Sequence, residues 1–297
     1  MKLIFFGAGY CSKFILKSLE GFDEIICTHN LQSSSQPFDK TLKIKRMIFS
    51  EFLKNHNSLF SGVTHILNSI PPIVKKDLVL DLLRNTECKN FNKLKWVGYL
   101  SSTSVYGDHL GKWVNEQTTP NPKTIRGKIR KKIEDSYYKL FRENNFPVHI
   151  FRLPGIYGPQ RSAVEKLLNG NNRVIKKPNQ FFSRIYVEDI SSAIIKSMEN
   201  PTPGEIFNIS DNHPCSSEEV TIYAAKLLKI KNLTFIDINS PKINKITKDF
   251  YRDNKRVSNK KIKKILGWTP KFENYKLGLK EILNNINAKD SANNSLS

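Results

Sequence analysis

The length and composition of the chain exclude several classes of protein. Its 297 residues are enough for a large buried core, as one domain or as a domain with a small lobe. No run approaches the roughly 18 consecutive apolar residues of a membrane-spanning helix, and the LIFFGAG run is too short for a signal-peptide core. We therefore expect a cytoplasmic protein with no membrane partner. The four cysteines are widely spaced without a C-x-x-C pair, which predicts reduced thiols and no metal site.

The formal net charge of +21 raises the question of nucleic acid as a partner. Much of the excess lies between Lys226 and Lys280, where 16 Lys or Arg residues stand against 4 Asp or Glu residues. Nucleic-acid binders usually interleave such residues with aromatic side chains or place them on a reading helix, so nucleic acid is not the expected partner. Two interpretations stay open, a compositional bias with a solvated basic face and a functional surface that binds anions.

The first half of the chain alternates short apolar runs with helical patterns. Strand-like runs occur at residues 2–6, 24–28, 42–48, 64–70, 94–101 and 147–153. Helical patterns follow the glycines after the first run as far as about Leu19, and recur at about 72–84 and 124–145. Strands that alternate with helices form β-α-β units around a parallel sheet that is buried on both faces. The predicted fold class is α/β, with a doubly wound parallel sheet.

The rhythm changes after Leu153, where segments become shorter and are punctuated by proline and asparagine. A helix near 187–198 and a strand at 205–210 still fit the large sheet. The spacing Ser216-x-x-Glu219 predicts a capping box at the start of another helix. The predicted parts are a first domain at residues 1–153, to which 184–211 return, a small C-terminal α/β substrate lobe at 154–183 and 212–285, and a flexible tail at 286–297.

A glycine-rich segment follows the first predicted strand and opens a helix. In Gly7-Ala-Gly9-Tyr10-Cys-Ser12, Gly7 would permit a tight turn and Gly9 a close approach of the backbone to a pyrophosphate. The amides and the dipole of a helix N-terminus favour such an anion. Ser12 stands where a third glycine is common and is small enough for helix and strand to pack closely. This context predicts a Rossmann-like dinucleotide site; the alternative is a glycine turn without a ligand.

The end of the second predicted strand bears on the choice of dinucleotide. Its last residues, Thr28-His29-Asn30, include no Asp or Glu that could bind a ribose diol. This absence leaves room for a 2′-phosphate, although no arginine stands there to bind it. The predicted cofactor is therefore NADP or NAD, with a slight preference for NADP.

Several motifs together resemble the extended, epimerase/dehydratase-like branch of the short-chain dehydrogenase/reductase superfamily. The matching segments are GAGYCS at 7–12, SIPP at 69–72, YLSSTSVYG at 99–107, NEQTTPNP at 115–122, RLPGIYGP at 152–159, RIYVEDI at 184–190, FNISD at 207–211 and RVSNKKIKKILGW at 256–268. Within the superfamily the chain resembles a bacterial branch of NAD(P)-binding oxidoreductases that lacks the Tyr-x-x-x-Lys dyad. The resemblance implies a Rossmann-like fold and an NAD(P) cofactor.

The helix that carries this dyad in the superfamily carries two arginines here. Arg126-Gly-Lys-Ile-Arg130 keeps the spacing, with Glu134 four residues further on. In the typical family the tyrosine exchanges a proton with the substrate, whereas a guanidinium with a pKa above ~12 has no proton to exchange at neutral pH. Two arginines one turn apart predict a clamp for an anion; the alternative is a pair of solvated arginines on a basic helix.

The resemblance also implies roles for residues at other strand ends. Ser102, with its neighbour Thr103, matches the position that holds the substrate oxygen, and both join the two arginines as predicted catalytic residues. The predicted cofactor-binding residues are Gly7, Gly9, Tyr10, Ser12, Thr28, Ser69 and Pro71. The predicted substrate-binding residues are Tyr106, Tyr157, Arg184 and Arg256. The nearby candidates for a replacement acid or base are Tyr106, Asp108, His109 and Glu116.

Two functions from different classes follow. The leading hypothesis is an NAD(P)-dependent oxidoreductase or epimerase/dehydratase-like enzyme that transfers hydride to or from a nucleotide-sugar-like or other anionic metabolite, without the usual dyad. The second hypothesis is a non-catalytic NAD(P)-binding sensor or regulatory protein. The expected partners are an anionic small molecule and, in a homodimer, a second copy of the chain.

Overall fold

A seven-stranded parallel sheet forms the centre of the computed structural model, which describes residues 1–30, 44–72 and 76–294. Within those residues the strand order is β11-β7-β5-β4-β1-β2-β3. The strands are β1 (Lys2–Phe6), β2 (Glu24–His29), β3 (Ile44–Ile48), β4 (His65–Asn68), β5 (Trp96–Ser102), β7 (Val148–Leu153) and β11 (Ile206–Asn208). All neighbouring strands run parallel, which confirms the predicted α/β class and the doubly wound sheet.

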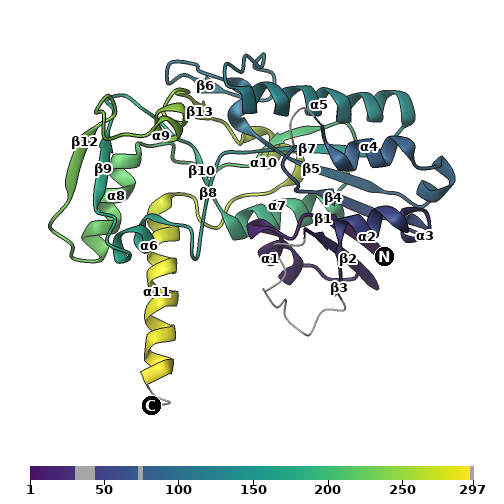
Figure 1. Cartoon of the computed structure of the whole chain (residues 1–297), viewed down its shortest axis with the longest axis horizontal. Coiled ribbons are helices and arrows are strands. Elements are labelled where there is room, and N and C mark those ends of the chain that lie inside the picture. The colour runs from purple at the N-terminus through teal and green to yellow at the C-terminus, as the bar shows by residue number, and fades with distance from the viewer. Residues whose placement is uncertain (31–43, 73–75, 295–297) are drawn as a thin grey trace.

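Helices cover both faces of this sheet (Figure 1). They are α1 (Tyr10–Lys17), α7 (Val187–Glu199) and α10 (Lys260–Leu266) on one face, and α2 (Phe49–Lys54), α3 (His56–Phe60), α4 (Leu78–Asn85), the 3₁₀ turn η2 (Cys88–Phe91) and α5 (Ile125–Asn144) on the other. Leu3 and Phe5 of β1 pack on the α1 side, whereas Ile4 and Phe6 pack on the α4 side. Successive side chains of a strand point to opposite faces, so a strand covered on both sides is apolar throughout.

A smaller lobe lies at the left of Figure 1. Its elements are β6 (Trp113–Val114), β8 (Gly155–Tyr157), α6 (Ala163–Leu168), β9 (Arg173–Lys176), β10 (Arg184–Tyr186), α8 (Ser217–Leu227), β12 (Thr234–Asp237), α9 (Lys245–Phe250), β13 (Arg256–Val257) and α11 (Tyr275–Asn294). β10 pairs with β8 of this lobe, so the chain returns to the large sheet only through α7 and β11. α8 begins with the predicted capping box between Ser216 and Glu219.

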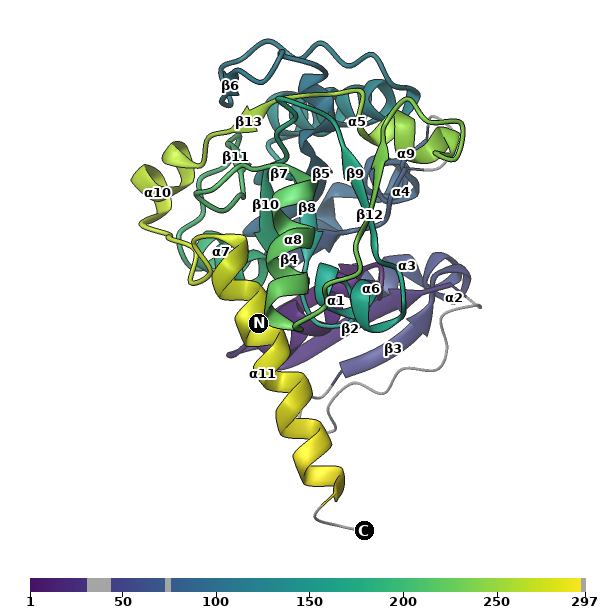
Figure 2. The ribbon, with the colours of Figure 1, turned by 90° about the vertical axis from the view of Figure 1, so that its left-hand side faces the viewer.

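The last helix, α11, continues where a flexible tail was predicted. It begins at Tyr275 and runs as helix to Asn294, and its far end projects away from the body of the molecule (Figures 1 and 2). Tyr275, Leu279 and Ile282 are buried in the small lobe. Once a helix is anchored in this way, each further residue adds one backbone hydrogen bond. The polar side chains at the end of the chain therefore do not prevent the helix from continuing. None of the helices in the described residues is long and apolar enough to cross a membrane.

Candidate active site

The strand order places one reversal point at the centre of the sheet. From β1 the chain moves outward to β2 and β3, and it then crosses back to β4, which pairs with β1 on the opposite side. Ligands of open α/β sheets bind beyond the carboxyl ends of the strands at such a point. The glycine segment follows β1 and Ser69 follows β4, so both lie at this edge.

The structure requires glycine at position 7 of this segment but not at position 9. Gly7 has a φ of +104°, and a Cβ there would lie 2.6 Å from the Ser69 hydroxyl, so a side chain would be strained and crowded. Its amide donates a hydrogen bond of 3.2 Å to the carbonyl of Thr28, which holds the turn against β2. A Cβ on Gly9 would meet no described residue within 4 Å. Within the part of the chain that the structure describes, the space in front of Gly9 is therefore open.

The remaining predicted cofactor residues mostly shape this loop. The buried Ser12 hydroxyl donates to the carbonyl of Gly9 at 2.6 Å, and the Ser69 hydroxyl donates toward the carbonyl of Gly7 at 2.9 Å. The Tyr10 hydroxyl donates to the carbonyl of Pro159 at 2.9 Å, so it joins the loop to the chain after β8. Thr28 is fully buried, and its hydroxyl has no hydrogen-bond partner among the described residues. Pro71 is exposed.

The helix α5 brings its first turn against the end of β5. The hydroxyl of Thr124 caps the helix by accepting from the amide of Gly127 at 3.1 Å. A Cβ on Gly127 would lie 2.6 Å from the carbonyl oxygen of Ser104, so only glycine allows this close approach to η3 (Thr103–Tyr106). Ser102 caps η3, because its half-buried hydroxyl accepts from the Ser104 amide at 3.2 Å, and Thr103 is buried.

The arginines at the two dyad positions of α5, Arg126 and Arg130, have different surroundings. Arg126 is exposed in the first turn. Arg130 is partly buried, and its Nη1 donates hydrogen bonds of 2.9 Å to the Tyr99 hydroxyl and to the Leu100 carbonyl. The structure therefore differs from the predicted two-arginine clamp. Arg130 is bound to β5 through the Tyr99 hydroxyl and the Leu100 carbonyl, whereas the exposed Arg126 makes no hydrogen bond or ion pair with any residue that the structure describes.

The four candidates for a replacement proton donor all have partners within the chain. Tyr106 is fully buried and its hydroxyl donates to Oδ1 of Asn208 at 2.9 Å. Glu116 accepts from the amide of Asn208 at 2.8 Å, and burial raises its pKa. Asp108 accepts two backbone N–H groups, and His109 contacts the carbonyl of Tyr106 through Nε2 at 3.1 Å. Tyr106, which was also expected to bind substrate, therefore lies in the interior instead.

Two further residues expected at the substrate cleft are engaged in the small lobe. Tyr157 is 8% exposed and lies among the apolar residues of that lobe, where burial raises the pKa of its hydroxyl. Arg184 is half-buried, and the N–H groups of its Nη1 already have acceptors within the chain. Its guanidinium donates at 2.9–3.1 Å to the backbone carbonyls of Phe182, Cys215 and Ser216. In the structure, both side chains join segments of the lobe.

Arg256 is the other predicted substrate cation. Its guanidinium carbon lies 3.9 Å from the centre of the Phe181 ring, and it makes no ion pair with any residue that the structure describes. Its backbone amide donates to the carbonyl of Lys112 at 3.0 Å, which pairs β13 with β6. A stacked guanidinium keeps its N–H groups available at the ring edge. Arg256 and Arg126 are thus the two predicted cations that remain available to an anion.

The comparisons with known proteins agree with this architecture. No protein-family model matches the sequence. A conserved protein of unknown function from Silicibacter pomeroyi has a solved structure with a TM-score of 0.85 and 35% identity, covering 96% of this chain and 98% of that one. ADP-L-glycero-D-manno-heptose-6-epimerase of Brachyspira hyodysenteriae is 23% identical over 93% of this chain and 94% of its own length. Over almost its whole length the chain is similar to this epimerase, and it shares its fold with solved epimerases and dehydratases.

Two further matches differ in how much of the chain they cover. The Escherichia coli protein YeeZ is 34% identical over 122 residues, which are 39% of this chain and only 40% of YeeZ. The solved structure of dTDP-glucose 4,6-dehydratase from Bacillus anthracis, a complex with NAD, has a TM-score of 0.73 and 18% identity and covers 94% of this chain and 96% of that one. The second match is a likeness of fold.

A buried ion pair behind the site was missed by sequence reasoning. Glu134 of the superfamily helix α5 accepts from Arg152 of β7, with a shortest distance of 2.7 Å to Nη2, and both side chains are 3% exposed. The hydroxyl of Ser101 donates to the same carboxylate at 2.6 Å. Burial alone would lower the pKa of Arg152, but the bonds and charge of Glu134 raise it. The Tyr-x-x-x-Lys-x-x-x-Glu spacing and the Arg of RLPGIYGP were the available signals.

Proposed function

We propose that the chain is an NAD(P)-dependent enzyme that transfers hydride to or from a hydroxyl or carbonyl of a nucleotide-sugar-like or other anionic metabolite, without the Tyr-Lys dyad. One observation carries the proposal: the open space over Gly9, at the N-terminus of α1 and at the reversal point of the sheet. A helix N-terminus with free amides binds a pyrophosphate when no side chain stands before it.

The residues around this space fit a dinucleotide. Gly7 makes the turn, Gly9 leaves room, and the unpartnered buried hydroxyl of Thr28 lies beside the loop that would hold the cofactor. A bound nicotinamide would supply the hydride acceptor or donor. The absence of a carboxylate in Thr28-His29-Asn30 supports our preference for NADP, while the NAD bound to the Bacillus anthracis enzyme supports NAD as the other choice.

On the substrate side, we propose that the exposed Arg126 and the stacked Arg256 bind the anionic group. Ser102, half-buried at the end of β5, would orient the reacting oxygen. The four side-chain candidates for proton transfer are engaged elsewhere, so we propose that water or an unconventional acid completes that step. A homodimer remains part of the proposal.

The test is dinucleotide binding by the parent chain and by Gly9→Val. Because a Cβ at position 9 meets none of the described residues within 4 Å, the variant should fold, yet its side chain would occupy the space for the pyrophosphate. We expect thermal stabilisation by NADP or NAD in the parent chain and at least a roughly tenfold weaker affinity in Gly9→Val. Gly155→Val is the control, since the nearest neighbour of its Cβ would lie 3.5 Å away and Gly155 begins β8 of the small lobe. Equal thermal stabilisation of the parent chain and of Gly9→Val by the dinucleotide would show that it does not bind at Gly9.

Measuring substrate turnover distinguishes the proposed enzyme from a non-catalytic dinucleotide sensor. The parent chain, with either dinucleotide, would be assayed for absorbance change of the nicotinamide against nucleotide sugars and other phosphorylated hydroxyl compounds. An enzyme should turn over at least one of them, and Arg126→Ala should reduce that turnover. Tight dinucleotide binding without turnover of any compound in such a panel would favour the non-catalytic sensor.

A further inference from the structure

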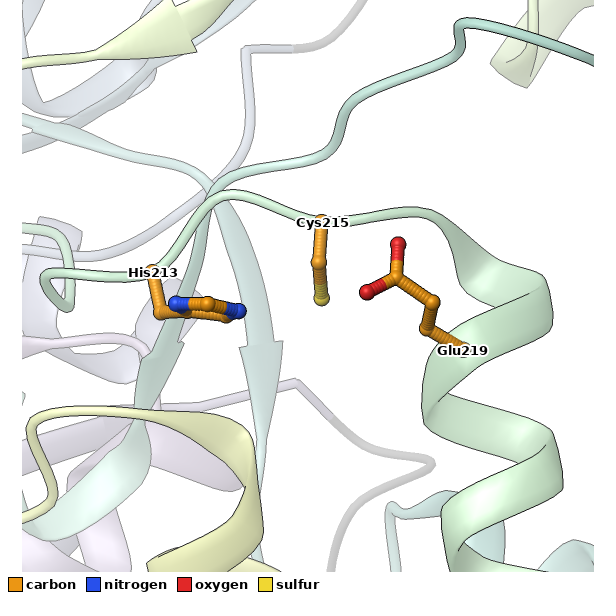
Figure 3. A group of neighbouring side chains, drawn as sticks. All are labelled: His213, Cys215 and Glu219. Carbon is orange, nitrogen blue, oxygen red and sulfur yellow. The ribbon is translucent and has the colours of Figure 1, made fainter.

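A cluster of three potential metal ligands lies in the small lobe, away from the dinucleotide edge. It consists of His213, Cys215 and Glu219, whose side chains point toward one another with the sulfur of Cys215 between the other two (Figure 3). One ligand atom from each residue lies within 4.8 Å of the others. Cys215 is a free thiol, as are the other cysteines of the chain.

Local structure explains why the three side chains meet. The carboxylate of Asp211 accepts from the backbone amide of His213 at 3.1 Å, which turns the chain after β11. Cys215 exchanges backbone hydrogen bonds of 2.9 and 3.2 Å with Phe182, which holds the sulfur at a defined place. Glu219 occupies the third position of α8, so its carboxylate faces back toward the residues before the helix. The spacing His-x-Cys-x-x-x-Glu thus becomes a cluster only in the folded chain.

We propose that His213, Cys215 and Glu219 bind a divalent transition metal of the zinc class, with water in the fourth position. Thiolate, imidazole and carboxylate are the ligand types of zinc sites, and three protein ligands plus water form a common tetrahedral arrangement. Bond lengths of about 2.0–2.3 Å place tetrahedral ligands roughly 3.3–3.8 Å apart. His213 and Glu219 are exposed, so their side chains can close the difference by small rotations.

The charges around the cluster suit a cation. The carboxylates of Glu219 and Asp211 and the guanidinium of Arg184 interact electrostatically with the Cys215 thiol. The second carboxylate oxygen of Asp211 is buried without a hydrogen-bond partner among the described residues. A cation bound at the cluster would be attracted by the two carboxylates.

Arg184 is compatible with a metal because of how it is bound. Its Nη1 lies 3.2 Å from the sulfur of Cys215, and the same guanidinium donates to three backbone carbonyls of the lobe. A donor to the sulfur of a metal-bound thiolate orients that ligand and stabilises its charge. Arg184 is therefore a positioning residue for the proposed site. A bound ion would tie the loop after β11 to α8 and so stabilise the lobe.

The test uses cobalt(II) as a spectroscopic probe on the full chain after treatment with a chelator. We expect one equivalent of cobalt to bind, to give a thiolate-to-metal absorption band, and to be displaced by zinc. Cys215→Ser should lose the band, whereas Cys88→Ser, which removes the exposed cysteine, should retain it. Glu219→Gln should weaken binding at least tenfold while keeping the capping box, because glutamine also fills that position.

Three outcomes would overturn the proposal: no stoichiometric binding, a band that persists in Cys215→Ser, or a band that disappears in Cys88→Ser. Circular dichroism of each metal-free variant shows whether its fold is intact. If Cys215→Ser does not fold, His213→Ala decides, since the imidazole is exposed and its removal should leave the fold unchanged. Unchanged cobalt affinity in His213→Ala would then exclude the site.

Discussion

The dinucleotide edge and the substrate side of this molecule differ in what they are made of. At the dinucleotide edge the binding features belong to the backbone, namely a turn at Gly7 and open space at Gly9. On the substrate side the expected features are side chains, and Tyr106, Arg130 and Arg184 have found partners within the protein. A site formed by the backbone can be recognised in the sequence from the spacing of its glycines. A site built from side chains depends on which neighbours those side chains meet, so a motif match alone does not establish it.

The largest expected loss of stability comes from the buried ion pair between Glu134 and Arg152, which supports the sheet behind the two sites. Glu134→Ala leaves Arg152 buried without its partner, and breaking a buried pair in this way costs about 3–5 kcal/mol. We expect that loss in the free energy of unfolding measured with urea. The matched control is Glu143→Ala, which removes an exposed pair with Lys139 on the same helix and should change stability by less than about 0.5 kcal/mol. Similar losses in both variants would mean that the buried pair contributes no more than a surface one.

One pH dependence of stability is expected from His149 in the interior of the sheet. His149 is fully buried, and its Nε2 accepts from the amide of Thr202 at 2.8 Å, so the ring is neutral in the folded chain. Burial lowers its pKa to about 4 from an ordinary 6.5. Its contribution to stability is therefore full above pH 6.5 and is lost as the pH falls toward 4, by about 3 kcal/mol.

The check on this pH dependence is urea unfolding at pH 7.5, 6, 5 and 4.5 for the parent chain and for His149→Gln. The variant should lose less stability between those values, because glutamine can accept the same N–H group but does not titrate. His56→Gln, at an exposed position, is the control and should follow the parent chain. A variant with the parent's slope would show that another group sets the pH dependence.

Replacing Arg130 tests whether this arginine of α5, unlike Arg126, serves stability and not the site. Arg130→Met removes two hydrogen bonds from a charged donor to Tyr99 and Leu100, which we expect to cost about 2 kcal/mol of unfolding free energy. Dinucleotide affinity of the folded variant shows whether this residue also serves the cofactor edge. A change in affinity without a change in stability would restore Arg130 to the candidate site.

The smallest effect on stability is expected at Arg126. Arg126→Ala should change the unfolding free energy by less than about 0.5 kcal/mol, because the side chain is exposed. Under the proposed function it should raise KM for an anionic substrate about tenfold and leave dinucleotide affinity unchanged. Lys128→Ala, at an exposed position two residues further on, is the control for loss of charge alone. Equal changes in KM for the two variants would mean that general charge, and not Arg126, attracts the substrate.

Much of the fold could be predicted from residue patterns. The runs at 2–6, 24–28 and 147–153 became β1, β2 and β7, because a strand covered on both faces must be apolar along its whole length. The capping box at Ser216 and Glu219 was also visible, since it depends on residues three apart. The short helices α2 and α3 had no comparable pattern, and the helical end of α11 was hidden by its polar composition.

The sequence by itself determined the parallel sheet and the glycine turn, because each depends on the spacing of neighbouring residues. Only the tertiary structure decided that Arg130 is bound to β5, that Glu134 is buried with Arg152, and that Arg126 is left exposed. Only the folded chain brings the sulfur of Cys215 near the guanidinium of Arg184. The physical reason is that a polar side chain takes the nearest partner in space, and those partners come from elements far apart along the chain.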